Sequence, residues 1–228
     1  MRNILGIILV AGIITTSFGQ TDRPEQPDIP GEFLVDVGLN GLYNNQDLNL
    51  RTFRSRTVGV YYMYTRKLGD RFSVNPMLGV SVDRYSFKSK VNFVQQEDRT
   101  FAFDTLDDLN LQKSLLSVVY LELPLEVRFY PFKTLSGEGP FVGLGGMAGL
   151  RIKSYTKVKY KQGGDRRVDK NAAPFGLTNF RYGVQGRLGF KTANVFFKYY
   201  LSDLFENVPE PLNSNPGTFT IGINFTGF

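Results

Sequence analysis

The sequence predicts an all-β fold: an eight-stranded antiparallel up-and-down transmembrane β-barrel with long extracellular loops and short periplasmic turns. Three observations lead to this prediction. Short segments with alternating apolar and polar residues recur along the whole chain, and successive side chains of a strand point to opposite faces. The connections between these segments are alternately long and short. The first residues have the composition of an export signal.

The chain starts with a predicted signal peptide over residues 1–19. Arg2 supplies a positive charge, Ile4–Ile14 form a short apolar stretch, and Ser17–Gly19 offers small residues at the usual cleavage spacing. The apolar stretch is shorter than the roughly 18 residues that a spanning helix needs. Residues 20–31 form a proline-rich leader, and residues 32–228 form the predicted barrel domain. We therefore expect export through a cleaved signal peptide to the cell outer membrane.

The first half of the barrel domain contains four strand candidates, at residues 32–42, 57–68, 71–87 and 114–131. Each has an apolar residue at every second position, which predicts one apolar face per strand. In order, these apolar residues are Val35, Val37 and Leu39; Val58, Val60 and Tyr62; Val74, Leu78, Val80 and Val82; and Leu121, Leu123, Leu125 and Val127. Pro76 and Pro124 lack the amide donor of a strand residue, so we expect bulges or register shifts there.

The second half contains four more candidates, at residues 140–155, 180–190, 194–202 and 217–228. The alternation is clearest in residues 180–190, where Tyr182 and Val184 alternate with Arg181 and Gln185. The other apolar faces are those of Val142, Leu144, Leu150 and Ile152; of Val195, Phe197 and Tyr199; and of Phe219, Ile221, Ile223 and Phe225.

The connections predict the topology. Residues 43–56, 88–113, 156–176 and 203–216 form long connections, whereas residues 69–70, 132–139 and 192–193 form shorter ones. Long loops at one rim and short turns at the other are typical of bacterial outer-membrane barrels with both chain ends in the periplasm.

Composition excludes several classes of function. The chain has no His and no Cys, so it lacks the commonest general base and the usual zinc ligands, and it forms no disulfide. We therefore expect no enzyme activity and no catalytic, cofactor or metal site. The net charge of +6 fits nucleic-acid binding poorly in an exported chain with 20 Phe and 12 Tyr, so no nucleic-acid partner is expected.

Three segments resemble a known family. Tyr120–Pro131, with the sequence YLELPLEVRFYP, resembles the signature of PorT-like outer-membrane β-barrel proteins, and Phe141–Gly146 resembles the next element of that family. Phe219–Phe228 resembles the closing strand that the barrel-assembly machinery recognises, although its apolar residues are one position out of step with Phe228. Either this strand ends near Phe225 or it contains a bulge. The resemblance implies a Gram-negative outer membrane, insertion by that machinery and an association with a secretion or envelope complex.

Charged residues occupy the polar faces of the strands, which an eight-stranded barrel turns inward. Such an interior is just wide enough for side chains to fill, and a lone buried charge costs several kcal/mol. We therefore predict an interior plug of salt bridges centred on Glu122 and Glu126; the alternative is a narrow polar pore. The acids are Asp36, Asp83, Glu122 and Glu126, and the bases are Arg128, Arg151, Lys153, Arg181, Arg187, Lys191 and Lys198.

A basic set lies in and beside the third long connection: Lys157, Lys159, Lys161, Arg166, Arg167 and Lys170. Such a set can bind the phosphates of outer-membrane lipid, including lipopolysaccharide, or an acidic envelope protein. Attraction to the acidic second connection (Glu97, Asp98, Asp104, Asp107 and Asp108) explains it without any ligand. These patterns predict a non-enzymatic structural or partner-binding barrel that acts through its extracellular loops. A narrow porin-like passive channel for small solutes is the alternative, and a soluble carrier is a more distant one.

Overall fold

The computed structural model describes residues 30–44, 48–88, 91–95, 101–105, 110–132, 139–162, 165–190, 192–206, 208 and 212–227. The predicted signal peptide and most of the predicted leader lie outside these residues. In the described part of the chain, no helix combines the length and the apolar character needed to cross a membrane.

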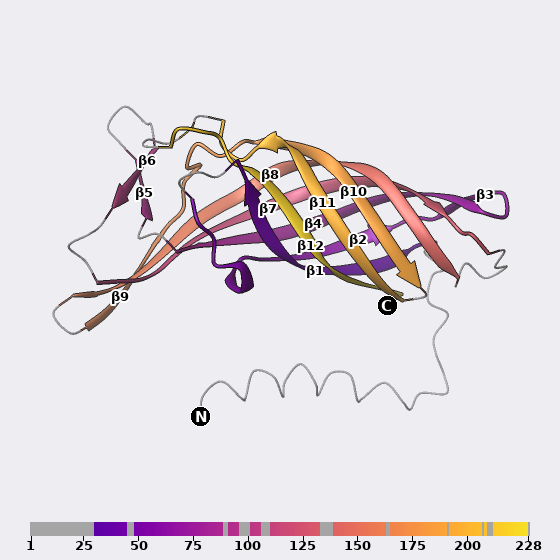
Figure 1. The fold of residues 1–228 in the computed structure, drawn as a ribbon, viewed down its shortest axis with the longest axis horizontal. Helices are drawn as coiled ribbons and strands as arrows, with labels where there is room; N and C mark the ends of the chain where they lie inside the picture. Colours follow the sequence, from indigo (N-terminus) through magenta and orange to yellow (C-terminus); the bar gives the residue numbers. More distant parts are fainter. Residues whose placement is uncertain are drawn as a thin grey trace, which may run out of the picture. The chain divides into compact units, whose positions relative to one another are not determined.

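Eight antiparallel strands form a closed barrel (Figure 1). They are β1 (Glu32–Tyr43), β2 (Arg56–Met63), β4 (Phe72–Phe87), β7 (Asn110–Phe129), β8 (Pro140–Gln162), β10 (Phe180–Phe190), β11 (Ala193–Asp203) and β12 (Gly217–Thr226). β12 pairs with β1 from Leu34↔Thr226 to Tyr43↔Gly217, so the barrel wall has no open edge. The predicted eight-stranded antiparallel barrel is confirmed.

Five short elements lie outside this wall: η1 (Thr52–Arg54), β3 (Arg66–Leu68), β5 (Val91–Gln95), β6 (Phe101–Thr105) and β9 (Asp165–Asn171). β3 pairs with the start of β4, β5 pairs with β6, and β9 pairs with the far end of β8. The third predicted loop, residues 156–176, is thus mostly a β-hairpin. The alternation of apolar and polar residues did not reveal this hairpin. Its residues are mostly charged, and a hairpin in water needs no apolar face.

The second predicted strand differs from the structure. Residues 57–68 were expected to form one strand, but β2 ends at Met63 and β3 begins at Arg66. The amide of Tyr64 still donates to the carbonyl of Pro76 (3.0 Å), which closes β2 against β4 at the break.

The two prolines interrupt a ladder without shifting it. β4 and β7 keep the same register on both sides, with Pro76↔Leu125 followed by Gly79↔Glu122. The ladder lacks the two pairs between these positions, where Pro124 has no amide hydrogen to donate. The expected bulge or register shift at Pro76 and Pro124 is therefore wrong for this pair of strands. At the other end of the sequence, β12 ends at Thr226 and Gly227 has φ +93°; Phe228 lies outside the described residues.

Side chains alternate across the wall as the pattern predicts. On β10, Leu188 is 61% exposed and its neighbour Arg187 is 3% exposed. The same alternation on the other strands leaves large apolar side chains on the outer surface, among them Val60, Leu78, Leu123, Leu144, Val195 and Ile223. An outer-membrane barrel presents such a surface to lipid hydrocarbon.

Apolar side chains also close the interior at the end where the long connections meet. This apolar cap consists of Leu48, Tyr85, Phe87, Leu116, Val118, Tyr120, Phe175, Leu177, Leu204 and Phe205. Main-chain bonds tie its loops together: the amide of Glu206 donates to the carbonyl of Gly176 (2.8 Å), and Leu50 forms a bridge with Phe87. A smaller cluster of Leu34, Tyr61, Met63 and Met77 lies nearer the turns.

Candidate functional site: a chain of charges inside the barrel

The middle of the barrel is filled with charged side chains. Of the eleven charged residues that the sequence places in the interior, the structure buries eight, each at 5% exposure or less. They come from five strands: Asp36 from β1, Asp83 from β4, Glu122, Glu126 and Arg128 from β7, Arg181 and Arg187 from β10, and Lys198 from β11.

The first half of the network starts at Asp83, below the apolar cap. Asp83 Oδ2 lies 2.5 Å from Arg181 Nη1, and Arg181 Nη2 lies 2.5 Å from Glu122 Oε1. The other carboxylate oxygen of Glu122, Oε2, lies 3.6 Å from Lys198 Nζ. Each acid in this half is therefore followed by a base.

The second half continues from Lys198 to Arg128. Lys198 Nζ lies 3.0 Å from Asp36 Oδ2, and Asp36 Oδ1 lies 3.6 Å from Arg187 Nη1. Arg187 Nε lies 3.1 Å from Glu126 Oε2, and Glu126 Oε1 accepts from Arg128 Nε at 2.6 Å. The eight residues thus form one ionic chain, Asp83–Arg181–Glu122–Lys198–Asp36–Arg187–Glu126–Arg128, in which the sign of the charge alternates at every step.

Neutral side chains also contact the charged groups of the ionic chain. Arg181 lies between two rings, with Cζ 3.4 Å from the Tyr120 centroid and 4.4 Å from the Tyr200 centroid. Tyr61 donates a hydrogen bond to Glu122 and accepts one from Lys198 at 2.8 Å. Such partners reduce the cost of removing ions from water, which pairing alone often fails to offset.

Further hydrogen bonds fix three of the four acids of the ionic chain. Thr57 donates to Asp83 at 2.7 Å, Asn224 donates to Asp36 at 2.6 Å, and Gln185 donates to Glu126 at 3.1 Å. Thr57 and Asn224 lie on strands paired with that of the acid they bind, and Gln185 lies on β10, which β8 separates from β7. These polar partners were not predicted from the sequence, although their parity on each strand marks them as inward-facing.

Glycines on β8 make room for the ionic chain. A Cβ added to Gly143 would lie 2.7 Å from Glu126 Oε1, and one added to Gly149 would lie 3.3 Å from both Arg181 Cγ and Glu122 Cγ. The glycine-rich inner face of this strand therefore allows the charged side chains of β7 and β10 to meet across it.

Two further bases of the predicted interior set, Lys153 and Arg151, are placed differently. Lys153 is exposed on the outer surface, because the β7–β8 register shifts between Val119↔Lys153 and Tyr120↔Arg151 and so adds one residue, Ile152, to β8. A bulge of this kind reverses the facing of every later residue. Arg151 is only half-buried and donates to Asn179 at 2.5 Å. Lys191 lies outside the described residues.

The basic set lies on the hairpin of β8 and β9. Lys157 is paired with Lys170 and Lys161 with Arg166, so cations stand opposite cations. Arg167 differs, because it lies opposite Tyr160 and interacts with it. A hydrogen bond to Asp169 raises the pKa of Tyr160 above its ordinary value. The acidic side chains between residues 97 and 108 lie outside the described part of the structure, so their attraction to this hairpin stays a prediction.

The family model described as the outer membrane protein beta-barrel domain matches residues 20–206. The chain belongs to this family. It is therefore an outer-membrane barrel protein, and the narrower PorT-like relationship stays a prediction.

No curated protein matches the chain. Among solved structures it is similar to Ail, the attachment invasion locus protein of Yersinia pestis, in complex with the heparin analogue sucrose octasulfate. The identity is 13%, with 87% of this chain and 99% of that chain covered and a TM-score of 0.36. A variant of the porin of Rhodopseudomonas blastica is 10% identical, with coverages of 86% and 98% and a TM-score of 0.21.

Removing one member of the ionic chain tests its energetic role. Arg181→Met leaves Asp83 and Glu122 without their shared base, and we expect a loss of about 3–5 kcal/mol in the free energy of unfolding. Asp83→Asn combined with Arg181→Met restores the balance of acids and bases, so this double variant should lose less. Urea unfolding in detergent micelles measures both values.

Arg71→Met is the matched control, since Arg71 is exposed in the turn before β4 and should unfold like the wild-type protein. A double variant as unstable as Arg181→Met, or less stable, would contradict the charge-balance account.

Proposed function

We propose that this protein is a closed, non-enzymatic outer-membrane barrel that does not conduct solutes and acts through its extracellular end as a structural or partner-binding component. The observation that carries the proposal is the filled interior. The ionic chain occupies the middle of the barrel, and the apolar cap, to which the long connections contribute Leu48, Phe175 and Phe205, closes the end beyond it.

A solute passing along the axis would have to break both barriers. Breaking a buried ion pair leaves an uncompensated charge, which costs about 3–5 kcal/mol. Entering the apolar cap would separate side chains such as Phe175 and Phe205, which are 0% and 1% exposed. Eight strands leave little further space, because a barrel of this size is only wide enough for side chains to fill.

The β8–β9 hairpin is the proposed working surface. β8 continues to Gln162, ten residues beyond Ile152, the last apolar residue on its outer face. At about 3.3 Å per residue these residues extend the strand well past the apolar surface. Lys157, Lys159 and Lys170 can therefore reach an acidic region of an envelope protein, or the phosphates of lipopolysaccharide, above the membrane.

The remaining parts of the proposal concern export and assembly. Residues 1–19 act as a cleaved signal peptide, and the barrel-assembly machinery inserts the folded barrel through its last strand. A secretion or envelope complex is the setting in which the hairpin meets its partner. The family match to an outer-membrane barrel domain supports this setting.

Planar-bilayer recording tests whether the barrel is closed. The wild-type protein should insert without stable ionic steps, because the ionic chain and the apolar cap fill its interior. Stable steps in proportion to the number of inserted barrels would contradict the proposal and favour a narrow passive channel.

An opened variant provides the positive control for that recording. Phe175→Ala, Phe205→Ala, Glu122→Ala and Arg181→Ala together remove two large rings of the cap and a balanced ion pair, and should produce steps. Replacing outward-facing phenylalanines instead, in Phe180→Ala with Phe197→Ala, should leave the bilayer silent.

Charge reversal tests the hairpin as a partner surface. A partner cross-linked in native outer membranes should be lost from the K157E/K159E/K170E variant and should dissociate from the wild-type protein at high salt. The control variant R66E/R71E reverses cations at the turn end and should keep the partner. Equal capture by both variants would contradict the proposed surface.

A further inference from the structure

The outer wall of the barrel differs between its two sides just beyond the apolar surface. On β2, β4 and β8, the next outward residue after the apolar run is a cation: Arg56 after Val58, Arg84 after Val82, and Lys153 after Ile152. Across the barrel, β11 ends in the acid Asp203, and Tyr199 of β11 stacks on Tyr43 of β1 with centroids 4.7 Å apart. Among the described strands of the wall, β2, β4 and β8 therefore present basic groups at this boundary.

Arg56 and Arg84 form the centre of the basic side. They are directly opposite each other in the β2–β4 ladder, and both side chains are exposed. Like charges directly opposite each other destabilise a sheet. Among the described residues no acid pairs with either one; Arg56 Nε donates only to the carbonyl of Phe53, at 2.7 Å. An anion between the two guanidinium groups would remove this repulsion.

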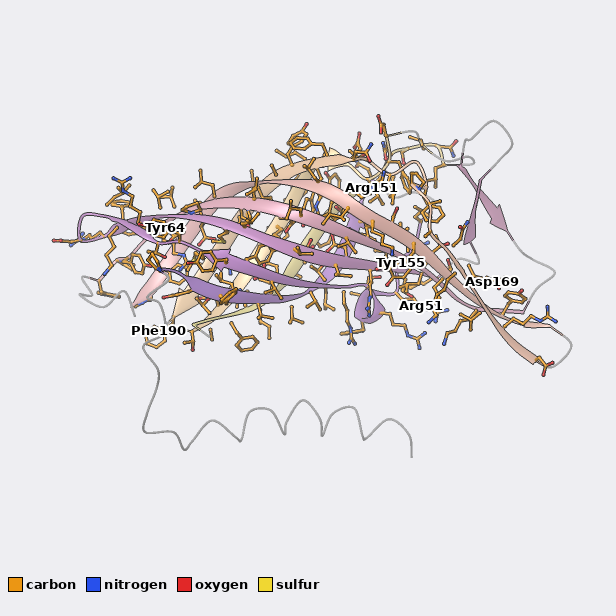
Figure 2. The ribbon with its side chains drawn as sticks, turned by 180° about the vertical axis from the view of Figure 1, so that it is seen from behind. Arg51, Tyr64, Arg151, Tyr155, Asp169 and Phe190 are labelled. Atoms are coloured by element: carbon orange, nitrogen blue, oxygen red, sulfur yellow. The ribbon has the colours of Figure 1, made fainter. Side chains whose placement is uncertain are left out.

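The turn η1 adds more cations and an exposed aromatic ring beside the pair. Phe53 is 77% exposed and lies between Arg51 and Arg54 in sequence. Residues 48–68 contain no Asp or Glu. In Figure 2, Arg51 and Tyr155 lie toward the end of the barrel that carries Asp169, away from Tyr64 and Phe190.

This turn is fixed to the wall. The amide of Arg51 donates to the carbonyl of Ser86 (2.7 Å), and the amide of Asn40 donates to the carbonyl of Ser55 (2.9 Å). The hydroxyl of Ser55, a fully buried residue, accepts from the amide of Ser86 at 3.0 Å. Phe53, Arg51 and Arg54 are therefore held beside Arg56 and Arg84 by main-chain bonds to β1 and β4.

We propose that this wall is a binding site for a phosphorylated glycolipid of the outer leaflet. Arg56 and Arg84 hold one phosphate by paired N–H···O bonds, a geometry that guanidinium groups favour. Arg51, Arg54 and Lys153 lie around this phosphate and neutralise further anionic groups of the same headgroup. The acyl chains lie along Val58 and Val82, with Phe53 at the level of the headgroup, where aromatic rings anchor at membrane interfaces.

The apolar run beside the cations decides between a lipid and a free anion. Val58 and Val82 are the next outward residues on the same two strands, and they are themselves a cross-strand pair. A ligand that uses both features has an anionic head joined to hydrocarbon. This site goes beyond the proposed function and depends on neither the closed interior nor the β8–β9 hairpin.

Native mass spectrometry of the detergent-solubilised barrel tests the site with three lipids: bisphosphorylated lipid A, the same lipid A without phosphates, and phosphatidylglycerol. The wild-type protein should retain bisphosphorylated lipid A through detergent exchange and lose the other two. The R56Q/R84Q variant should retain at most about one tenth as much bisphosphorylated lipid A as the wild-type protein, because each surface cation contributes to anionic-lipid binding.

The R66Q/R71Q variant is the matched control, since it removes two exposed arginines at the turn end and should retain the lipid like the wild-type protein. Heat-dependent mobility on gels confirms that each variant is folded. Phe53→Ala should weaken retention with the fold unchanged.

Three results would overturn the assignment. Equal retention by R56Q/R84Q and the wild-type protein would exclude the arginine pair. Equal retention of lipid A without phosphates would mean that hydrocarbon alone binds. Equal retention of phosphatidylglycerol would mean that the wall accepts any anionic lipid and does not select a glycolipid.

Discussion

The structure depends on one constraint: a charge enclosed by an eight-stranded barrel has to find its counter-charge inside the barrel. The ionic chain from Asp83 to Arg128 meets this constraint by alternating acids and bases across five strands. Every contact except Glu126–Arg128 joins residues on different strands, so the ionic chain forms only when the strands have the correct register. A slip of one residue would turn a strand's charges toward lipid and its apolar residues inward. Charge balance inside and apolar surface outside therefore specify the same register.

The same alternation lets one strand serve two environments. The lower part of β8 places glycines beside the ionic chain and Leu144 and Leu150 on the outer wall. Beyond Ile152 the bulge reverses the facing, and the strand continues as a basic hairpin. On β2 and β4, the outward apolar run ends without a bulge at the Arg56–Arg84 pair. The barrel thus combines a filled, charge-balanced interior with exposed cations on one outer side, on the hairpin and at the turn end.

The sequence predicted the parts of the fold that depend on alternation alone. Eight strands, their faces and the inward position of residues such as Glu122 and Arg187 follow from a period of two, because lipid and interior impose opposite polarity. The break after Met63 and the bulge at Ile152 did not follow, since both are decided by hydrogen bonds to neighbouring strands. The order of charges within the ionic chain was also beyond the sequence. That order depends on the stagger between strands, which places Lys198 beside both Asp36 and Glu122.

The most direct test uses two neighbouring residues and the absence of native Trp. Phe196 is 2% exposed and faces the ionic chain, whereas Phe197 is 44% exposed on the outer wall of β11. Phe196→Trp and Phe197→Trp each give a single-Trp protein whose fluorescence can be quenched by lipids with brominated acyl chains. The account predicts strong quenching of the residue-197 tryptophan and little quenching of the residue-196 tryptophan. Equal quenching, or the reverse order, would contradict it.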